Sequence, residues 1–130
     1  LVVLIYSNKN NTSLPKDFKI YTEKMFDFLL AILKPDKNLP LVNDSVNKYP
    51  IDVKDLLAAG ALFFNRGDFK FMSHEVAPPF LIKIFGEKGT KRYNGLPKKL
   101  PAIQSLILRG SNYVIMRSGW KNNCCLMLEI

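Results

Sequence analysis

The sequence predicts an α+β protein in which α-helices come first and an antiparallel β-meander follows. Two observations predict this division. Apolar residues recur at offsets of three and four between Leu14 and Leu33 and again after Asp52, which is the spacing of one helix face. From Ser105 to Ile130 the pattern changes to three short runs rich in Val, Ile, Leu and Tyr. Gly, Asn and Ser separate these runs, as they do in a meander.

The composition predicts one folded, basic domain. Of the 130 residues, 48% are hydrophobic and 23% are charged, which is ordinary for a globular protein and argues against disorder. The 19 Lys and Arg residues outnumber the 11 Asp and Glu residues and give a net charge of +8. Such a field attracts nucleic acid, acidic polysaccharide or an anionic membrane surface, and a lysine-rich surface without a specific partner is the alternative. No run approaches the roughly 20 apolar residues of a membrane span.

A long amphipathic helix is expected from Leu14 to Leu33. Ser13 is a candidate for its N-cap, Pro15 suits its first turn, and Pro35 ends it. Leu1–Tyr6, ahead of it, fits the last turns of another helix and equally a strand. The residues expected on the main apolar face of the long helix are Phe18, Tyr21, Met25, Phe28, Leu29 and Ile32, and Phe26, Leu30 and Leu33 widen that face. Such a broad surface indicates contact with more than one neighbouring helix.

A second helix is expected after a loop that runs from Lys34 to Tyr49. Asp52 is its predicted N-cap, and Asp55 three residues later makes a weak capping box. The Ala-Ala-Gly-Ala centre of this helix predicts a close approach by another helix. Gly67 is a natural C-terminal stop.

The segment before the sheet is expected to be a basic linker. Phe80–Phe85 fits a helix that starts at Pro78-Pro79 or a buried strand, and we favour the helix. Lysine, glycine and proline are frequent in residues 87–101. The predicted division is therefore a helical portion over residues 1–86, a basic linker over 87–101 and an antiparallel sheet over 102–130.

Two pairs of residues are candidates for ligand contact. Asn43 and Asp44 lie in the long loop, where their side chains can hydrogen-bond a sugar or cap a local turn. Arg117 and Trp120 flank a turn at the end of a strand, where they can bind a carboxylated sugar through an ion pair and stacking. In the alternative, the arginine pins the turn and the tryptophan covers an edge of the core.

The motifs of common enzymes are absent from the sequence. It has no phosphate-binding glycine loop, no paired-cysteine metal motif and no nucleophile elbow, so no metal ion or cofactor is predicted. His74 is the single histidine and is more simply a hydrogen-bonded surface residue than a catalyst. The linker interleaves Tyr93 with cations, as nucleic-acid contacts do. No known binding module frames it, so nucleic acid is the less favoured partner.

One run resembles a family signature. Residues 113–120 read YVIMRSGW, which resembles the segment Y-V-M-R-S-G-W that opens the β-sandwich of heparinase II/III-like polysaccharide lyases. Pro35-Asp36 and Leu39-Pro40 are similar to the family's P-D-G-x-x-P loop, Asn43-Asp44-Ser45 is similar to its G-D-S, and Asp52–Ala59 resembles its D-x-x-x-L-L-x-x-A helix. The chain departs from the pattern at Lys37, where the family has glycine, and at Lys121, where the family often has aspartate.

This resemblance implies the last helices of an (α/α) toroid that lead into an antiparallel β-sandwich. It also implies a protein that cleaves uronic-acid-containing polysaccharide, of the heparin, heparan or alginate type, by β-elimination. The family's catalytic motifs do not occur in the sequence, so no catalytic residue is assigned. We therefore expect an internal fragment of a polysaccharide lyase that is inactive alone. A bacterial lyase of this kind is periplasmic or secreted.

A function of a different class is also open, namely a basic module that binds acidic polymer without chemistry. The polymer is then either glycan or nucleic acid. The outer edges of a three-stranded meander invite pairing with the rest of a larger sheet or with a second chain. Partners of these two kinds are therefore expected at the sheet.

Overall fold

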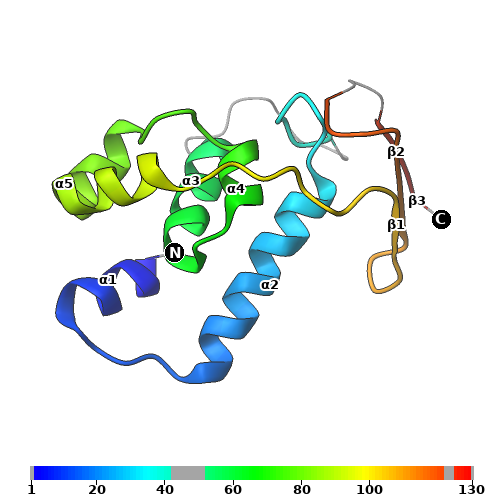
Figure 1. The fold of residues 1–130 in the computed structure, drawn as a ribbon. Helices are drawn as coiled ribbons and strands as arrows, with labels where there is room; N and C mark the ends of the chain where they lie inside the picture. Colours follow the sequence, from blue (N-terminus) through cyan, green and yellow to red (C-terminus); the bar gives the residue numbers. More distant parts are fainter. Residues whose placement is uncertain (1, 42–51, 122–124, 130) are drawn as a thin grey trace.

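Five helices precede a three-stranded sheet in the described part of the chain (Figure 1). The computed structural model describes residues 2–41, 52–121 and 125–129. The elements are α1 (Val2–Asn10), α2 (Lys16–Ile32), α3 (Val53–Phe64), α4 (Gly67–Met72), α5 (Pro79–Gly95), β1 (Leu106–Leu108), β2 (Tyr113–Arg117) and β3 (Cys125–Glu129). Helices α3, α4 and α5 lie on one side of α2, and the sheet lies beyond the C-terminal end of α2 (Figure 1). This order of elements confirms the predicted α+β class.

The opening apolar run is helical, so the strand alternative for it is wrong. Helix α1 continues past Tyr6 to Asn10, whose side-chain amide donates a hydrogen bond to the Tyr6 carbonyl at 2.9 Å. Asn11 then takes a left-handed φ of 49° and ends the helix. Leu4 is buried and attaches α1 to the rest of the helical part.

Helix α2 packs with only part of the predicted face, because Phe26 and Leu30, which were expected to widen that face, are buried and its centre is not. Tyr21 and Met25, at the centre of the predicted face, are 65% and 70% exposed. The residues that α2 buries are Thr22, Phe26, Leu30 and Ala31. The apolar residues of this helix cover more than one face, so the period of the pattern does not determine which of them is buried. Contact with the neighbouring helix α3 determines which face is buried, because the ring of Phe26 packs against Gly60 of α3.

The helix starts agree in part with their predicted caps. Asp52 is the N-cap of α3, as predicted, and accepts a hydrogen bond from the amide two residues later at 2.9 Å. Asp55 does not complete a capping box, because its carboxylate bonds the ring of His74 instead. Helix α2 begins after Pro15 without a side-chain cap, so the N-cap predicted at Ser13 is wrong.

Two glycines permit close approaches between segments. A Cβ atom at Gly60 would lie 2.6 Å from the ring of Phe26, so the close approach predicted at the centre of α3 is confirmed. The sequence pattern predicted that α3 stops at Gly67, and this prediction is wrong. Asn65 ends that helix with a left-handed φ of 55°. Gly67 starts α4, where a Cβ atom would lie 2.5 Å from the carbonyl oxygen of Pro97.

Helix α5 corrects the predicted linker. It starts at Pro79, so the helical alternative for Phe80–Phe85 is confirmed, and it continues to Gly95. The linker assigned to residues 87–101 is therefore wrong for residues 87–95. Gly86 has a positive φ of 61° and a non-helical backbone, so α5 consists of two helical pieces that meet at a kink. Lysine and arginine after the kink are good helix formers, and this property outweighs the glycines that indicated a linker.

The sheet is the predicted antiparallel meander, with strand order β1-β2-β3. Leu106 in β1 and Met127 in β3 both pair with Ile115 of the central strand. That strand buries Ile115 and Arg117 and exposes Met116. This alternation means that one face of β2 is covered while the other meets solvent.

The hydrophobic core lies among α2, α3, α4 and α5. Phe26 meets Phe64 edge to face with 5.6 Å between ring centroids, and its ring lies 5.8 Å from that of Phe69. The largest fully buried side chains are Tyr93, Phe69, Leu30, Leu33, Leu57, Met72, Leu81 and Ile115. Tyr93 therefore belongs to the core, whereas its sequence context among lysines indicated a solvated segment.

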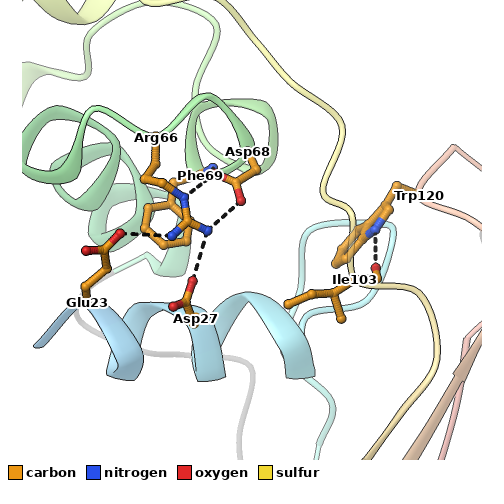
Figure 2. Close-up of polar contacts among 7 residues, drawn as sticks. All are labelled: Glu23, Asp27, Arg66, Asp68, Phe69, Ile103 and Trp120. Carbon is orange, nitrogen blue, oxygen red and sulfur yellow. Dashed lines mark hydrogen bonds and ion pairs between the residues drawn. The ribbon is translucent and has the colours of Figure 1, made fainter. Parts of the chain in front are cut away.

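Arg66 joins α2 to the turn between α3 and α4 (Figure 2). Its guanidinium donates to Glu23 at 3.0 Å and to Asp27 at 2.9 Å, both on α2. It donates to the two carboxylate oxygens of Asp68 at 2.9 Å and 2.6 Å, and it lies 4.3 Å from the ring centroid of Phe69. Burial by itself raises the pKa of the Asp68 carboxyl, but the hydrogen bond and charge of Arg66 outweigh burial and lower this pKa.

The Arg66 contacts predict how the substitution Asp68→Asn changes the response to acid. Because the folded-state pKa of Asp68 lies below its ordinary value of 3.8, its contribution to stability is complete above that value and is lost as the pH falls through the folded pKa. We expect the wild-type free energy of unfolding to exceed that of Asp68→Asn by about 1–2 kcal/mol at neutral pH. The difference should shrink well below pH 3.8.

Urea unfolding of wild type and Asp68→Asn, at neutral pH and well below pH 3.8, measures this difference in the free energy of unfolding. Glu87→Gln is the control, because the Glu87 carboxylate is exposed and lies 4.0 Å from the Lys91 amine, so its removal should matter little at either pH. A difference between wild type and Asp68→Asn that does not change with pH would contradict the role of the Arg66 contacts.

Candidate functional site

Of the four predicted ligand contacts, Asn43 and Asp44 lie outside the described residues. The other two, Arg117 and Trp120, lie together beside the end of α2. The central guanidinium carbon of Arg117 lies 3.9 Å from the centroid of the Trp120 ring. Each of the two residues is only 5% exposed, so the surrounding protein covers the pair.

Arg117 bonds the sheet to the helical part. Its Nη2 atom donates to the carbonyl oxygen of Ala31 at 3.0 Å and to that of Leu33, and its Nη1 atom donates to the carbonyl oxygen of Gln104 at 2.9 Å. The last carbonyl groups of a helix lack partners within the helix, and cations are stabilised there. The guanidinium on β2 therefore satisfies the C-terminal end of α2.

Trp120 closes the same contact. Its Nε1 atom donates to the carbonyl oxygen of Ile103 at 2.7 Å (Figure 2), and its side chain belongs to the helical core. We call Arg117, Trp120 and the C-terminal end of α2 the sheet joint. Burial and hydrogen bonding at the sheet joint favour the structural alternative, in which the arginine pins the turn and the tryptophan covers the core, over contact with a sugar.

His74 lies in a polar cluster that sequence reasoning missed. Its Nε2 atom lies 2.7 Å from Oδ1 of Asp55. The buried hydroxyl of Tyr93 donates to the backbone carbonyl of His74 at 2.7 Å and lies 2.8 Å from the hydroxyl of Ser73. Burial raises the pKa of Tyr93. Because Tyr93 bonds the backbone of His74 and not its ring, the cluster is not a proton relay of the kind that activates a nucleophile.

Lysines surround the loop that contains Ser73 and Glu75. Lys37 donates to the carbonyl oxygen of Ser73 at 3.2 Å, and Lys98 pairs with Glu75. Burial lowers the pKa of Lys37, and the charges of Lys98 and then Lys54 lower it further. The loop therefore carries a local excess of positive charge.

Lys70 contributes to the same excess from the interior. Its amine donates to the carbonyl oxygen of Tyr93 at 2.6 Å and lies 4.0 Å from the centroid of that ring. Burial lowers the pKa of Lys70, and the charge of Lys98 lowers it further. Lys70 is thus fixed within the fold, whereas Lys98 is exposed at the surface.

A pocket of about 660 Å³ opens between α1, the start of α2, the end of α3 and α5. Its apolar lining consists of Leu4, Leu14, Leu62, Phe63, Phe64 and Phe85. Its polar lining consists of Ser7, Asn11, Lys16, Lys19, Lys88 and Arg92. Sequence reasoning missed this pocket because residues 87–101 read as a linker. The available signal is the four-residue spacing of Lys88 and Arg92, which brings both to one side of a helix.

Comparisons with family models, with curated proteins and with solved structures find no match to the chain. In residues 2–41, 52–121 and 125–129, no three His, Cys, Asp or Glu side chains are placed to hold a metal ion. No helix in those ranges combines the length and apolar character needed to cross a membrane.

The sheet joint predicts the effect of the substitution Arg117→Lys. A single ammonium group cannot replace hydrogen bonds to the three carbonyl groups, so buried acceptors lose their partner. We expect the free energy of unfolding to fall by about 2–4 kcal/mol, as measured by urea unfolding. Arg109→Lys is the matched control, because Arg109 is exposed at the end of β1, and it should change stability by about 0.5 kcal/mol or less. Equal stability of the two variants would contradict the sheet joint.

Proposed function

We propose that this chain is part of a polysaccharide lyase that cleaves uronic-acid-containing polysaccharide, of the heparin, heparan or alginate type, by β-elimination. The observation that carries the proposal is the run YVIMRSGW at residues 113–120. This run resembles the opening of the family's sandwich, and in this protein it forms β2 and supplies both side chains of the sheet joint. In the proposal, the helices are the last ones of an (α/α) toroid and the meander opens the β-sandwich.

The loop after α2 supports the same proposal. The family has a glycine in its P-D-G-x-x-P loop where this chain has Lys37. Lys37 takes a left-handed φ of 67°, a conformation that glycine adopts without steric cost. Its amide donates to the carbonyl oxygen of Lys34 at 2.9 Å and closes a turn. The geometry at this position is thus one that favours the family's glycine.

The described residues supply part of the chemistry that β-elimination needs. The reaction requires neutralisation of the sugar carboxylate, a base that removes the C5 proton and an acid that protonates the leaving oxygen. His74 and Tyr93 have suitable groups, but Asp55 engages the first and the backbone of His74 engages the buried second. The lysines can attract carboxylates. We therefore assign no catalytic residue and expect the chain alone to be inactive.

The test compares the 130-residue chain with a full-length protein that contains it. Both are incubated with heparan sulfate and with alginate, and the ultraviolet absorbance of the unsaturated uronate measures turnover. We expect turnover by the full-length protein and none by the chain alone. Absence of product from the full-length protein with both polymers would contradict the lyase assignment. Product from the chain alone would contradict the absence of catalytic residues within it.

A second candidate function is a basic module that binds acidic polymer without chemistry. The observation that favours it is a stripe of exposed cations along the second half of α5 and the segment that follows. These cations are Lys88, Lys91, Arg92, Lys98 and Lys99. The Lys91 amine lies 4.0 Å from the Glu87 carboxylate and both side chains are almost fully exposed, so this contact neutralises little of the positive charge of the stripe.

Neutralising the five cations of the stripe to glutamine should weaken binding to heparin by at least about tenfold and reduce its dependence on salt. The matched control neutralises four lysines and one arginine that are exposed elsewhere. These are Lys9, Lys24, Lys83, Lys121 and Arg109. Titrations at several salt concentrations, with heparin and with single-stranded DNA, measure both quantities. Equal affinity of the two variants for both polymers would contradict a polymer-binding role for the stripe.

A further inference from the structure

The pocket between α1, α3 and α5 has an apolar floor that solvent can reach. Leu62 is buried, whereas Phe63, Phe64 and Phe85 are only half-buried. The rings of Phe63 and Phe85 meet edge to face with 5.4 Å between centroids, which holds the floor in one arrangement. Half-buried aromatic rings at the bottom of a pocket leave apolar area that a ligand can cover.

The rim of this pocket is cationic. Lys16 and Lys19 come from the first turn of α2, and Lys88 and Arg92 come from α5. All four side chains are exposed, and no acidic residue is among the described residues that line the pocket. Across the described ranges, none of the four forms an ion pair with a carboxylate. Their charge is therefore available to an anionic group at the mouth of the pocket.

Two glycines of α5 give the rim its position. The kink at Gly86 separates the first turns of α5 from the part that carries Lys88 and Arg92. At Gly89 a Cβ atom would lie 2.2 Å from Cβ of Phe85 and 3.7 Å from Leu62. The absence of a side chain at Gly89 therefore avoids a clash with Phe85, which is part of the floor. Cations of α5 thus stand beside an aromatic surface within one pocket.

We infer that this pocket binds an amphipathic anion, a molecule with an apolar body and a carboxylate or phosphate head. The six apolar lining residues cover the body, and the four cations of the rim hold the head. A sugar fits less well, because among the described side chains the neutral polar ones of the lining are Ser7 and Asn11, and none is Tyr or Trp. The volume of about 660 Å³ lies in the range of small-molecule sites.

The first test uses dodecanoate and dodecyl phosphate, each below its micelle concentration, in calorimetric titrations of the 130-residue chain. A rim variant replaces Lys16, Lys19, Lys88 and Arg92 by glutamine. Its matched control replaces three other exposed lysines and one exposed arginine, namely Lys83, Lys91, Lys121 and Arg109. We expect affinity for at least one of the two anions to fall at least about tenfold in the rim variant and to change little in the control. Equal affinities of the two variants would overturn the inference.

The second test addresses the apolar floor without altering the protein. Octanoate has the same head as dodecanoate and four fewer methylene groups, so its affinity should be at least about tenfold lower. Dodecyltrimethylammonium has the chain but a cationic head, and we expect no binding. Binding of this cation as tight as that of dodecanoate would overturn the inference. So would a uronate oligosaccharide that loses affinity in the rim variant while dodecanoate does not bind. Both tests measure binding and neither measures lyase activity, so their outcomes can be interpreted even if the proposed function is wrong.

Discussion

The arrangement of the two parts of this protein depends on the Arg117 guanidinium. It lies at the C-terminal end of α2, where the last carbonyl groups have no partner within the helix. From the central strand of the sheet, it donates hydrogen bonds to these carbonyl groups. Trp120 excludes water from the contact and adds a bond to the segment that enters the sheet. A bond of this kind is directional, so it sets the angle between sheet and helix as well as holding them together. The packing of Arg117 and Trp120 therefore accounts for their presence in the run at residues 113–120 without a bound substrate.

The types of some elements could be predicted from the sequence, because these elements have a local signal. The helical spacing after Asp52 and the alternating runs after Ser105 both appear in the structure as α3 and the meander. The packed face of α2 could not be predicted, since Tyr21 and Phe26 are both apolar and only the partner helix distinguishes them. A linker was expected over residues 87–101 because lysine, glycine and proline are frequent there, yet a second helical piece begins directly after the positive φ of Gly86.

The candidate sites divide in the same way. Arg117 and Trp120 could be identified from the sequence as neighbours at one turn, but their burial could not, because Arg117 bonds carbonyl groups more than eighty residues earlier in the chain. The pairing of His74 with Asp55 joins the loop after α4 to helix α3 and has no sequence pattern. The pocket gathers residues from four helices, and two of its four cations, Lys88 and Arg92, belong to a segment whose composition suggested a linker. The sequence therefore indicated which side chains can make polar contacts, but it did not indicate which distant residues they contact in the fold.

The exposed side of α2 sets how molecules of this chain behave toward one another. Tyr21 and Met25 leave an apolar strip in water, while the net charge of +8 makes two copies repel. The repulsion reaches only about one Debye length, roughly 8 Å at physiological salt, but the attraction between apolar strips is not screened by salt. The colloidal stability of the chain is therefore a function of ionic strength, and added salt moves the balance from dispersed molecules toward contact along α2.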